Sequence, residues 1–249
     1  MRVVALLPFL PLLLKAQDER VVKSPDGRVE FRLFVAQPND GDLAQLAYQV
    51  WFHGAEVLTT SWMGLDIHNQ EPLLGQNLGL IHSSTASGGS GQEKYNTLTA
   101  EYMQNGSLGR RLNVEVRAYD DGVAFRYVIP KSAPLSEILI QQEGTVFSFV
   151  RDASLAESGA EARFDLPFIT TQPEAGRIVI AETGEPGFPR AHLTHVEGAS
   201  LIARLPPRPD DPNLAFVGTT PMTLPWYVVA FGLEKDRLPQ SPIFRDLAH

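Results

Sequence analysis

Apolar and polar residues alternate with a period of two in several separate stretches of this sequence. Residues 29–35, 46–52 and 98–102 show the pattern most clearly. Successive side chains of a β-strand point to opposite faces, so the alternation is typical of strands with one buried and one solvated face. Residues 177–181 and 226–231 are more uniformly apolar, which indicates strands buried on both faces.

Turn signals separate these stretches. SPDG stands at 24–27, PNDG at 38–41 and QNG at 104–106, and such residues favour tight turns. Short strands with regular turns and no sustained helical period predict an all-β fold, either a sandwich or a barrel. A chain of 249 residues can bury a full hydrophobic core within one such domain.

The clearest hairpin signal is RRLNVEVRAYDDGVAFRYVIP at 110–130, in which two alternating runs flank Asp120, Asp121 and Gly122. We expect Gly122 to supply a positive φ at the turn. A general acid/base pair would have to face a cleft, whereas a hairpin tip projects into water. The two aspartates are therefore expected to be ionised turn residues with no role in catalysis.

Composition excludes several functions. The net charge is −8, so the surface repels phosphate backbones and a nucleic-acid partner is not expected. The sequence has no cysteine, which excludes disulfides, thiol nucleophiles and zinc–thiolate sites. Residues 83–91 (SSTASGGSG) lack the Gly-Lys-Ser/Thr ending of a phosphate loop, and we expect a flexible surface loop there.

The N-terminus is predicted to be a signal peptide covering residues 1–17, followed by one β-sandwich domain at 18–249. One arginine precedes an apolar run at 3–14 that is too short to span a bilayer. Pro8 and Pro11 argue against a buried strand in this run. The prediction implies an exported protein, periplasmic or extracellular, with no membrane span.

No self-contained active site is visible in the sequence. His192, His195 and Glu197 lie close together, but on a strand His192 faces away from the other two, so a metal site is not favoured over ordinary polar residues. A Gly-x-Ser-x-Gly elbow is absent, and sequence alone cannot pair the scattered carboxylates for glycoside chemistry.

Taken in order, several segments resemble the N-terminal domain of glycoside hydrolase family 97, whose members are α-glucosidases and α-galactosidases. The matching segments span roughly residues 20–249. The most specific is RLNVEVRAYDDGVAFRY at 111–127. The others are SPDG at 24–27, MGL at 63–65, YN at 95–96, LT at 98–99, IVIAE at 178–182, PW at 225–226 and SPIFRDL at 241–247.

The resemblance implies a large antiparallel β-sandwich of the mutarotase-like supersandwich type. In the family this domain packs against a (β/α)8 catalytic barrel that follows it and carries the acid and the nucleophile or base. The sandwich supplies one glutamate to a calcium ion, and by position that glutamate is similar to Glu182. The implied partners are this barrel and a carbohydrate of the α-glucoside or α-galactoside class.

Two features depart from the family pattern. Tyr227 stands where the family usually has arginine, and the barrel's catalytic residues are absent from these 249 residues. We therefore expect no hydrolysis by the chain alone, and calcium binding only together with the barrel.

Two alternatives to this interpretation remain. The first is a stand-alone carbohydrate-binding sandwich that reads sugars through Trp51, Trp62 and Trp226, although such tryptophans are more often core residues. The second is an enzyme in its own right. It would need His53, His82 and Glu101 to face one concave sheet.

Overall fold

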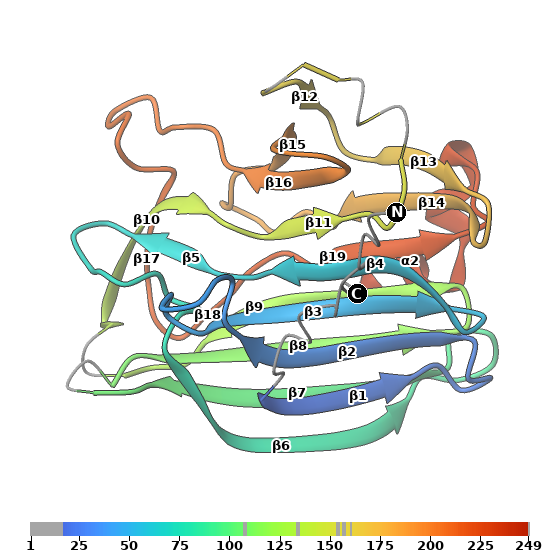
Figure 1. Ribbon diagram of the computed structural model, residues 1–249, viewed down its shortest axis with the longest axis horizontal. Helices are drawn as coiled ribbons and strands as arrows, with labels where there is room; N and C mark the ends of the chain where they lie inside the picture. The colour runs from blue at the N-terminus through green and yellow to red at the C-terminus, as the bar shows by residue number, and fades with distance from the viewer. Residues whose placement is uncertain are drawn as a thin grey trace, which may run out of the picture.

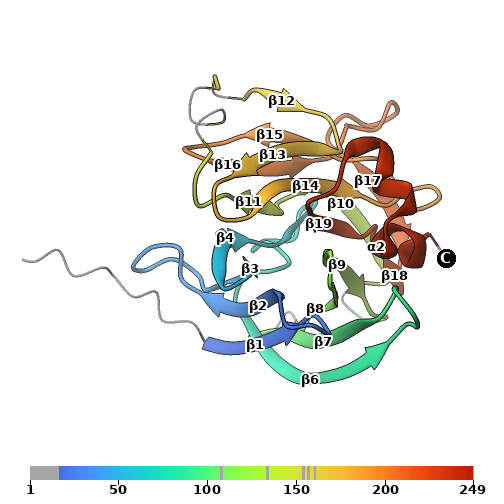
Figure 2. The same ribbon diagram turned by 90° about the vertical axis from the view of Figure 1, so that its right-hand side faces the viewer.

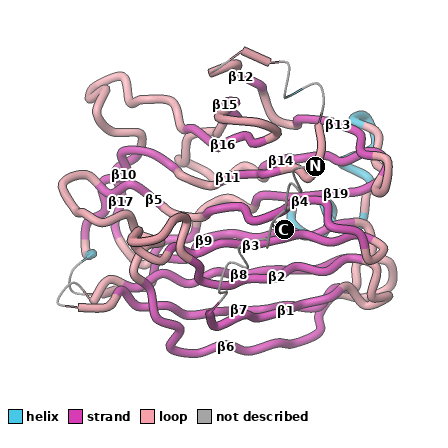
Figure 3. Tube along the Cα trace, in the orientation of Figure 1, coloured by secondary structure: helices cyan, strands magenta, loops and turns pink. Residues whose placement is uncertain are grey.

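The computed structural model describes residues 17–106, 109–132, 135–152, 155, 158–159 and 161–248. The predicted signal peptide lies outside these residues, apart from Gln17, and stays a prediction. Strands dominate the described chain (Figure 3), so the expected all-β class is confirmed. No helix in the described part of the chain is long and apolar enough to cross a bilayer.

The strands form two layers that face each other, as an antiparallel β-sandwich requires (Figures 1 and 2). One layer is an eight-stranded sheet. Its strands, in spatial order, are β13 (Phe168–Gln172), β14 (Gly176–Glu182), β19 (Tyr227–Phe231), β9 (Gly122–Ile129), β8 (Arg111–Tyr119), β7 (Tyr95–Gln104) and β6 (Leu78–Gly88), with β18 (Met222–Thr223) paired to β9.

The second layer is built from three smaller sheets. Two of them have four strands and follow one another in Figure 2, and Leu58 of one bridges Phe149 beside the other. Their orders are β1 (Gln17–Lys23), β2 (Val29–Ala36), β3 (Gln45–Phe52), β4 (Ala55–Trp62), and β11 (Val146–Ser148), β16 (Ser200–Arg204), β15 (His192–His195), β12 (Arg163–Phe164). The third sheet contains β17 (Phe216–Thr219), β10 (Glu137–Glu143) and β5 (Leu65–Ile67).

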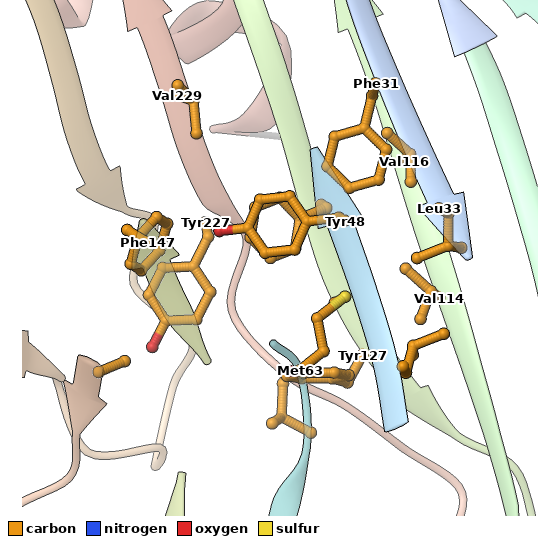
Figure 4. Close-up of a cluster of buried hydrophobic side chains, with 14 of the residues drawn as sticks. Phe31, Leu33, Tyr48, Met63, Val114, Val116, Tyr127, Phe147, Tyr227 and Val229 are labelled. Carbon is orange, nitrogen blue, oxygen red and sulfur yellow. The ribbon is translucent and has the colours of Figure 1, made fainter. Parts of the chain in front are cut away.

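Aromatic rings fill the space between the layers. Tyr48 lies 5.2 Å from Phe31 and 4.8 Å from Phe125, measured between ring centroids. Phe147 and Tyr227 meet edge to face at 5.5 Å (Figure 4). These rings come from both layers and are fully or almost fully buried, so one continuous core holds the sandwich together.

The C-terminal segment covers part of the outer face of the eight-stranded sheet. A 3₁₀ helix, η2 (Lys235–Gln240), and a short helix, α2 (Pro242–Leu247), lie at one side of the molecule (Figure 3). Ile243 packs into a second apolar cluster with Tyr119 and Trp226. Asp246 accepts hydrogen bonds from Arg117 Nη1 at 2.7 Å and from the Tyr119 hydroxyl at 2.5 Å. The part of this face around Tyr119 and Trp226 is thus covered within the chain itself.

The predicted hairpin is confirmed, but its glycine serves another purpose. Tyr119 pairs with Gly122 across a two-residue turn, and Gly122 does not have a positive φ. A Cβ at this position would lie 2.6 Å from the carbonyl oxygen of Val229 and 2.9 Å from Cα of Ala230. Glycine is therefore required because β19 approaches β9 so closely.

The two aspartates at the hairpin tip do not simply project into water, as we expected. Asp120 accepts a hydrogen bond from the backbone N–H of Asp26, at 3.0 Å. Asp121 is partly buried, and burial raises the pKa of its carboxyl group. The tip is a contact point between segments, because other parts of the chain fold over it.

Residues 83–88 were expected to be part of a flexible loop, and this expectation is wrong. They form the second half of β6 and pair residue by residue with β7, from Ser83 with Ala100 to Gly88 with Tyr95. Glycine is depleted in strands, and only Thr85 of this segment is a residue type enriched in them. Here pairing with a neighbouring strand decides the conformation.

Candidate functional site

Glu182, the predicted calcium ligand, is the last residue of β14. The run before it alternates between the two cores: Ile180 faces the space between the layers, and Ala181 faces the cluster under the C-terminal segment. Just beyond it, Thr183 donates its N–H to the Trp226 carbonyl at 2.9 Å, and its hydroxyl accepts from the Trp226 N–H at 3.0 Å. The strand end that carries the carboxylate is therefore anchored.

The Glu182 carboxylate lies at the rim of two hollows. One has a volume of about 340 Å³ and is lined by the loop at 183–190 together with Pro225. The other, of about 530 Å³, extends to Leu166 and the C-terminal segment. Oε2 accepts the N–H of Ala191 at 3.1 Å, while Oε1 has no hydrogen bond to any residue that the structure describes. One oxygen thus orients the group and the other is available.

Burial controls the charge of this group. It raises the pKa of Glu182 to about 7, although the Ala191 N–H and the charge of Arg190 both act in the opposite direction. Arg190 lines both hollows. A Cβ at Gly184 would lie 3.3 Å from its guanidinium, so the arginine passes close to the loop backbone. Glu185 lines the first hollow and Lys235 the second, so the site combines carboxylates with cations.

A second carboxyl group, Glu143, lies nearby in the core. It is 2 % exposed and accepts hydrogen bonds from Thr145 Oγ1 at 2.7 Å and from the Tyr227 hydroxyl at 3.0 Å. Burial, opposed by these two bonds and reinforced by the charge of Glu182, raises the pKa of Glu143 to about 7. Tyr227 is also the cross-strand partner of Glu182.

Sequence reasoning missed Glu143. It is the last residue of β10, a strand of ordinary alternation, and no local motif marks it. The only sequence feature that could have pointed to Glu143 is Tyr227, which stands where the family usually has arginine. The structure shows what this tyrosine does: it is buried and donates its hydroxyl to Glu143.

The described residues do not complete a metal site, because they contain no group of three or more His, Asp or Glu side chains placed to hold an ion. Calcium requires six to eight oxygen ligands. Glu182 suits the role of one ligand, since its chemistry is right and one oxygen is available. The remaining oxygens would have to come from elsewhere, and calcium binding stays a prediction.

The other metal candidates are not brought together. Both ring nitrogens of the buried His195 lie against backbone carbonyls, those of Gly159 at 3.2 Å and Gly198 at 3.0 Å. His192 is on the alternate face of β15, and Glu197 is exposed in the turn that follows. The interpretation of His192 and Glu197 as ordinary polar residues fits these positions, although His195 is more buried than expected.

The residues of the two alternative interpretations are also scattered. His82 pairs directly with Glu101 across β6 and β7, but His53 lies in the turn between β3 and β4 of another sheet. Trp226 is 6 % exposed, with the guanidinium groups of Arg117 and Arg126 within 5 Å of its ring. Its ring belongs to the core and is too buried for a sugar to stack on it. Trp51 and Trp62 are partly exposed.

Comparison with known proteins decides the family. Residues 22–158 match the family described as Glycosyl-hydrolase 97 N-terminal. The chain belongs to this family. A glycoside hydrolase family 97 enzyme from Pseudoalteromonas sp. strain K8, in complex with acarbose, superimposes with a TM-score of 0.75 at 20 % identity. The match covers 92 % of this chain and 38 % of that one.

Two further relatives agree with this family 97 N-terminal fold. A beta-arabinopyranosidase structure has a TM-score of 0.66 at 20 % identity, over 87 % of this chain and 40 % of that one. The retaining alpha-galactosidase of Bacteroides thetaiotaomicron is 22 % identical over 235 residues, which cover 78 % of this chain and 33 % of that protein. The chain thus spans about a third of the length of this curated relative.

Proposed function

We propose that this chain is the N-terminal module of an exported α-glycosidase, in which Glu182 provides one ligand to a calcium ion held jointly with a (β/α)8 catalytic barrel. The observation that carries the proposal is the Glu182 carboxylate. It is held at the rim of two hollows with one oxygen bonded to the Ala191 N–H and the other available. A partly buried carboxylate at an anchored strand end suits an incomplete ion site that a second domain completes.

The role of this chain in the reaction is to position groups. The Ala191 N–H orients Glu182, and the bond between Thr183 and Trp226 fixes the strand end below it. Arg190 keeps a positive charge beside the carboxylate and favours its ionised form. A bound calcium ion would supply Lewis-acid polarisation of an oxygen atom. The carbohydrate would be an α-glucoside or α-galactoside, because the curated relative is a retaining alpha-galactosidase and the similar Pseudoalteromonas enzyme was solved with acarbose.

The proposal is tested by reading the encoding gene past the codon for His249 and purifying the polypeptide that it specifies. We expect the frame to continue into alternating strand–helix units and the product to hydrolyse aryl α-glucosides or α-galactosides with calcium. Glu182→Gln should weaken calcium binding by about tenfold or more, since it removes one charged ligand. Glu174→Gln, which changes an exposed carboxylate in the turn at the other end of β14 and lines neither hollow, is the matched control and should leave calcium affinity unchanged.

Two results would contradict the proposal. One is calcium-dependent hydrolysis by residues 1–249 alone, which would place the catalytic groups within this chain. The other is a full-length enzyme whose calcium affinity is the same in Glu182→Gln and in the wild type. A stop codon directly after His249 would rule out a barrel in the same polypeptide.

A further inference from the structure

A third hollow, which we call the Trp62 cleft, lies on the other layer of the sandwich. It has a volume of about 520 Å³, and its wall includes Gln45, Trp62, Asp66, Glu143, Ile202 and Arg204. It shares no lining residue with the two hollows at Glu182. Its size lies within the range of small-molecule sites.

The back of the cleft is fixed by buried polar groups. Gln45 is 9 % exposed; its amide donates to the Met63 carbonyl at 3.1 Å and accepts from Gln76 at 3.2 Å. Glu143, almost fully buried, is held by the hydroxyls of Thr145 and Tyr227. Groups whose hydrogen bonds are already made form a rigid wall that does not collapse into the hollow.

The cleft offers one aromatic surface. Trp62, at the end of β4, packs against the small outer cluster of Phe34, Ala36 and Ala47 and remains partly exposed. Contact with this cluster restricts the ring, so it presents a flat apolar surface of fixed orientation. An indole in this position suits a ligand that has a flat apolar face of its own.

The cleft also contains a negatively charged hydrogen-bond acceptor, Asp66, and a positively charged donor, Arg204. The Asp66 backbone pairs with Gln142 in the sheet, but its carboxylate has no hydrogen bond or ion pair to any part of the chain that the structure describes. Arg204 uses Nη1 to bond the Glu143 carbonyl at 2.9 Å, and its electrostatic attraction to Asp66 is not a direct ion pair. A carboxylate and a guanidinium that line one cavity without bonding each other are free to bind a third group between them.

These features select the class of ligand. An anion would meet Arg204 but also Asp66, in a chain of net charge −8, and a cation would meet Arg204. A neutral polyol avoids both conflicts, because each hydroxyl donates to a carboxylate and accepts from a guanidinium at the same time. A pyranose ring adds an apolar C–H face that fits an indole.

We propose that the Trp62 cleft is a binding site for a neutral sugar ring, with the ring against Trp62 and adjacent hydroxyls between Asp66 and Arg204. This goes beyond the proposed function, since the cleft needs neither calcium nor a catalytic barrel. It would hold a carbohydrate chain at a second point of the module. If Glu182 proved not to bind calcium, the sugar site would be unaffected. If the cleft bound no sugar, the calcium proposal would likewise be unaffected.

The test is isothermal titration calorimetry of the 249-residue chain with maltotriose and, separately, with raffinose. We expect saturable binding of at least one of them. Trp62→Ala and Asp66→Ala should each weaken it by about tenfold or more. Trp62→Phe should keep most of the affinity, because it retains an aromatic face. Asp66→Ala removes a partly exposed side chain and keeps the test valid if Trp62→Ala fails to fold.

Matched controls separate the cleft from general surface effects. Trp51→Ala removes a partly exposed tryptophan from the same outer sheet face, outside the cleft, and Asp40→Asn changes an exposed carboxylate. Both should bind sugar as the wild type does. The proposal is overturned by absence of saturable binding of either sugar, by equal losses in Trp51→Ala and Trp62→Ala, or by binding of glucuronate or sulfate in preference to the neutral sugars.

Discussion

At the level of single residues, the most informative group is the buried carboxyl of Glu143. A chain of hydrogen bonds runs from the Gly64 N–H to Tyr127, from Tyr127 to Thr145, and from Thr145 to Glu143. Tyr227 completes the set from the opposite side. Burial favours the neutral carboxylic acid in the core, and the two hydroxyl donors, which favour the ionised form, offset this only in part because they add no positive charge.

This arrangement predicts a pH dependence of stability. The pKa of Glu143 rises from 4.5 to about 7 on folding, so the folded state keeps a proton that the unfolded state releases. The stability it contributes is complete below pH of about 4.5 and is lost as the pH rises through about 7. The shift corresponds to roughly 3 kcal/mol in the free energy of unfolding. Urea denaturation between pH of about 5 and about 8 should show this decline.

Glu143→Gln should remove a large part of that decline, because the amide does not titrate. Glu137→Gln, which changes an exposed carboxylate on the same strand, is the control and should keep the wild-type profile. Identical profiles for Glu143→Gln and wild type would show that another group is responsible.

At the level of strands and helices, the close approach of β19 to β9 explains why the central hairpin has a glycine at position 122. We predict that Gly122→Ala destabilises the fold by about 1–3 kcal/mol, since its Cβ would clash with the backbone of β19. Denaturant titration measures the loss. Gly159→Ala is the comparison, because that position has open space and no positive φ; a similar loss in both variants would argue against the packing explanation.

The C-terminal helix α2 depends on one carboxylate. Asp246→Ala should lower the free energy of unfolding by about 1–3 kcal/mol, because Arg117 and Tyr119 lose a shared, partly buried partner. Trp226, packed beside Arg117, should show a changed fluorescence maximum if the segment loosens. Asp236→Ala, an exposed change in the same segment, is the control. An unchanged melting temperature in Asp246→Ala would mean that the apolar contacts and the Arg245–Glu93 ion pair hold α2 without this carboxylate.

At the level of the whole molecule, one core joins both layers. The main cluster contains residues such as Phe31 and Tyr48 from one layer and Phe125 and Val229 from the other. Neither layer can keep its inner face buried without the other. We therefore predict a single cooperative unfolding transition, with coincident curves from tryptophan fluorescence and far-ultraviolet circular dichroism. Two separated transitions would show that the layers fold as independent units.

The amino-acid sequence alone was enough for the fold class, the central hairpin and the position of Glu182 at a strand end. Alternation with a period of two is a local property, so residues 29–35 and 46–52 reveal strands without knowledge of their neighbours. The ordered segments shared with family 97 placed Glu182, and the structure puts it where β14 ends. Export and calcium binding stay predictions.

Tertiary structure alone decided the rest, because it depends on which distant strands become neighbours. Residues 83–88 form a strand since β7 pairs with them, and Gly122 is needed because β19 passes beside it. Glu143 meets Tyr227 across 84 positions of sequence. Local patterns tell which face of a strand a side chain occupies. Contacts between distant segments arise only when the layers pack, so no local pattern encodes them.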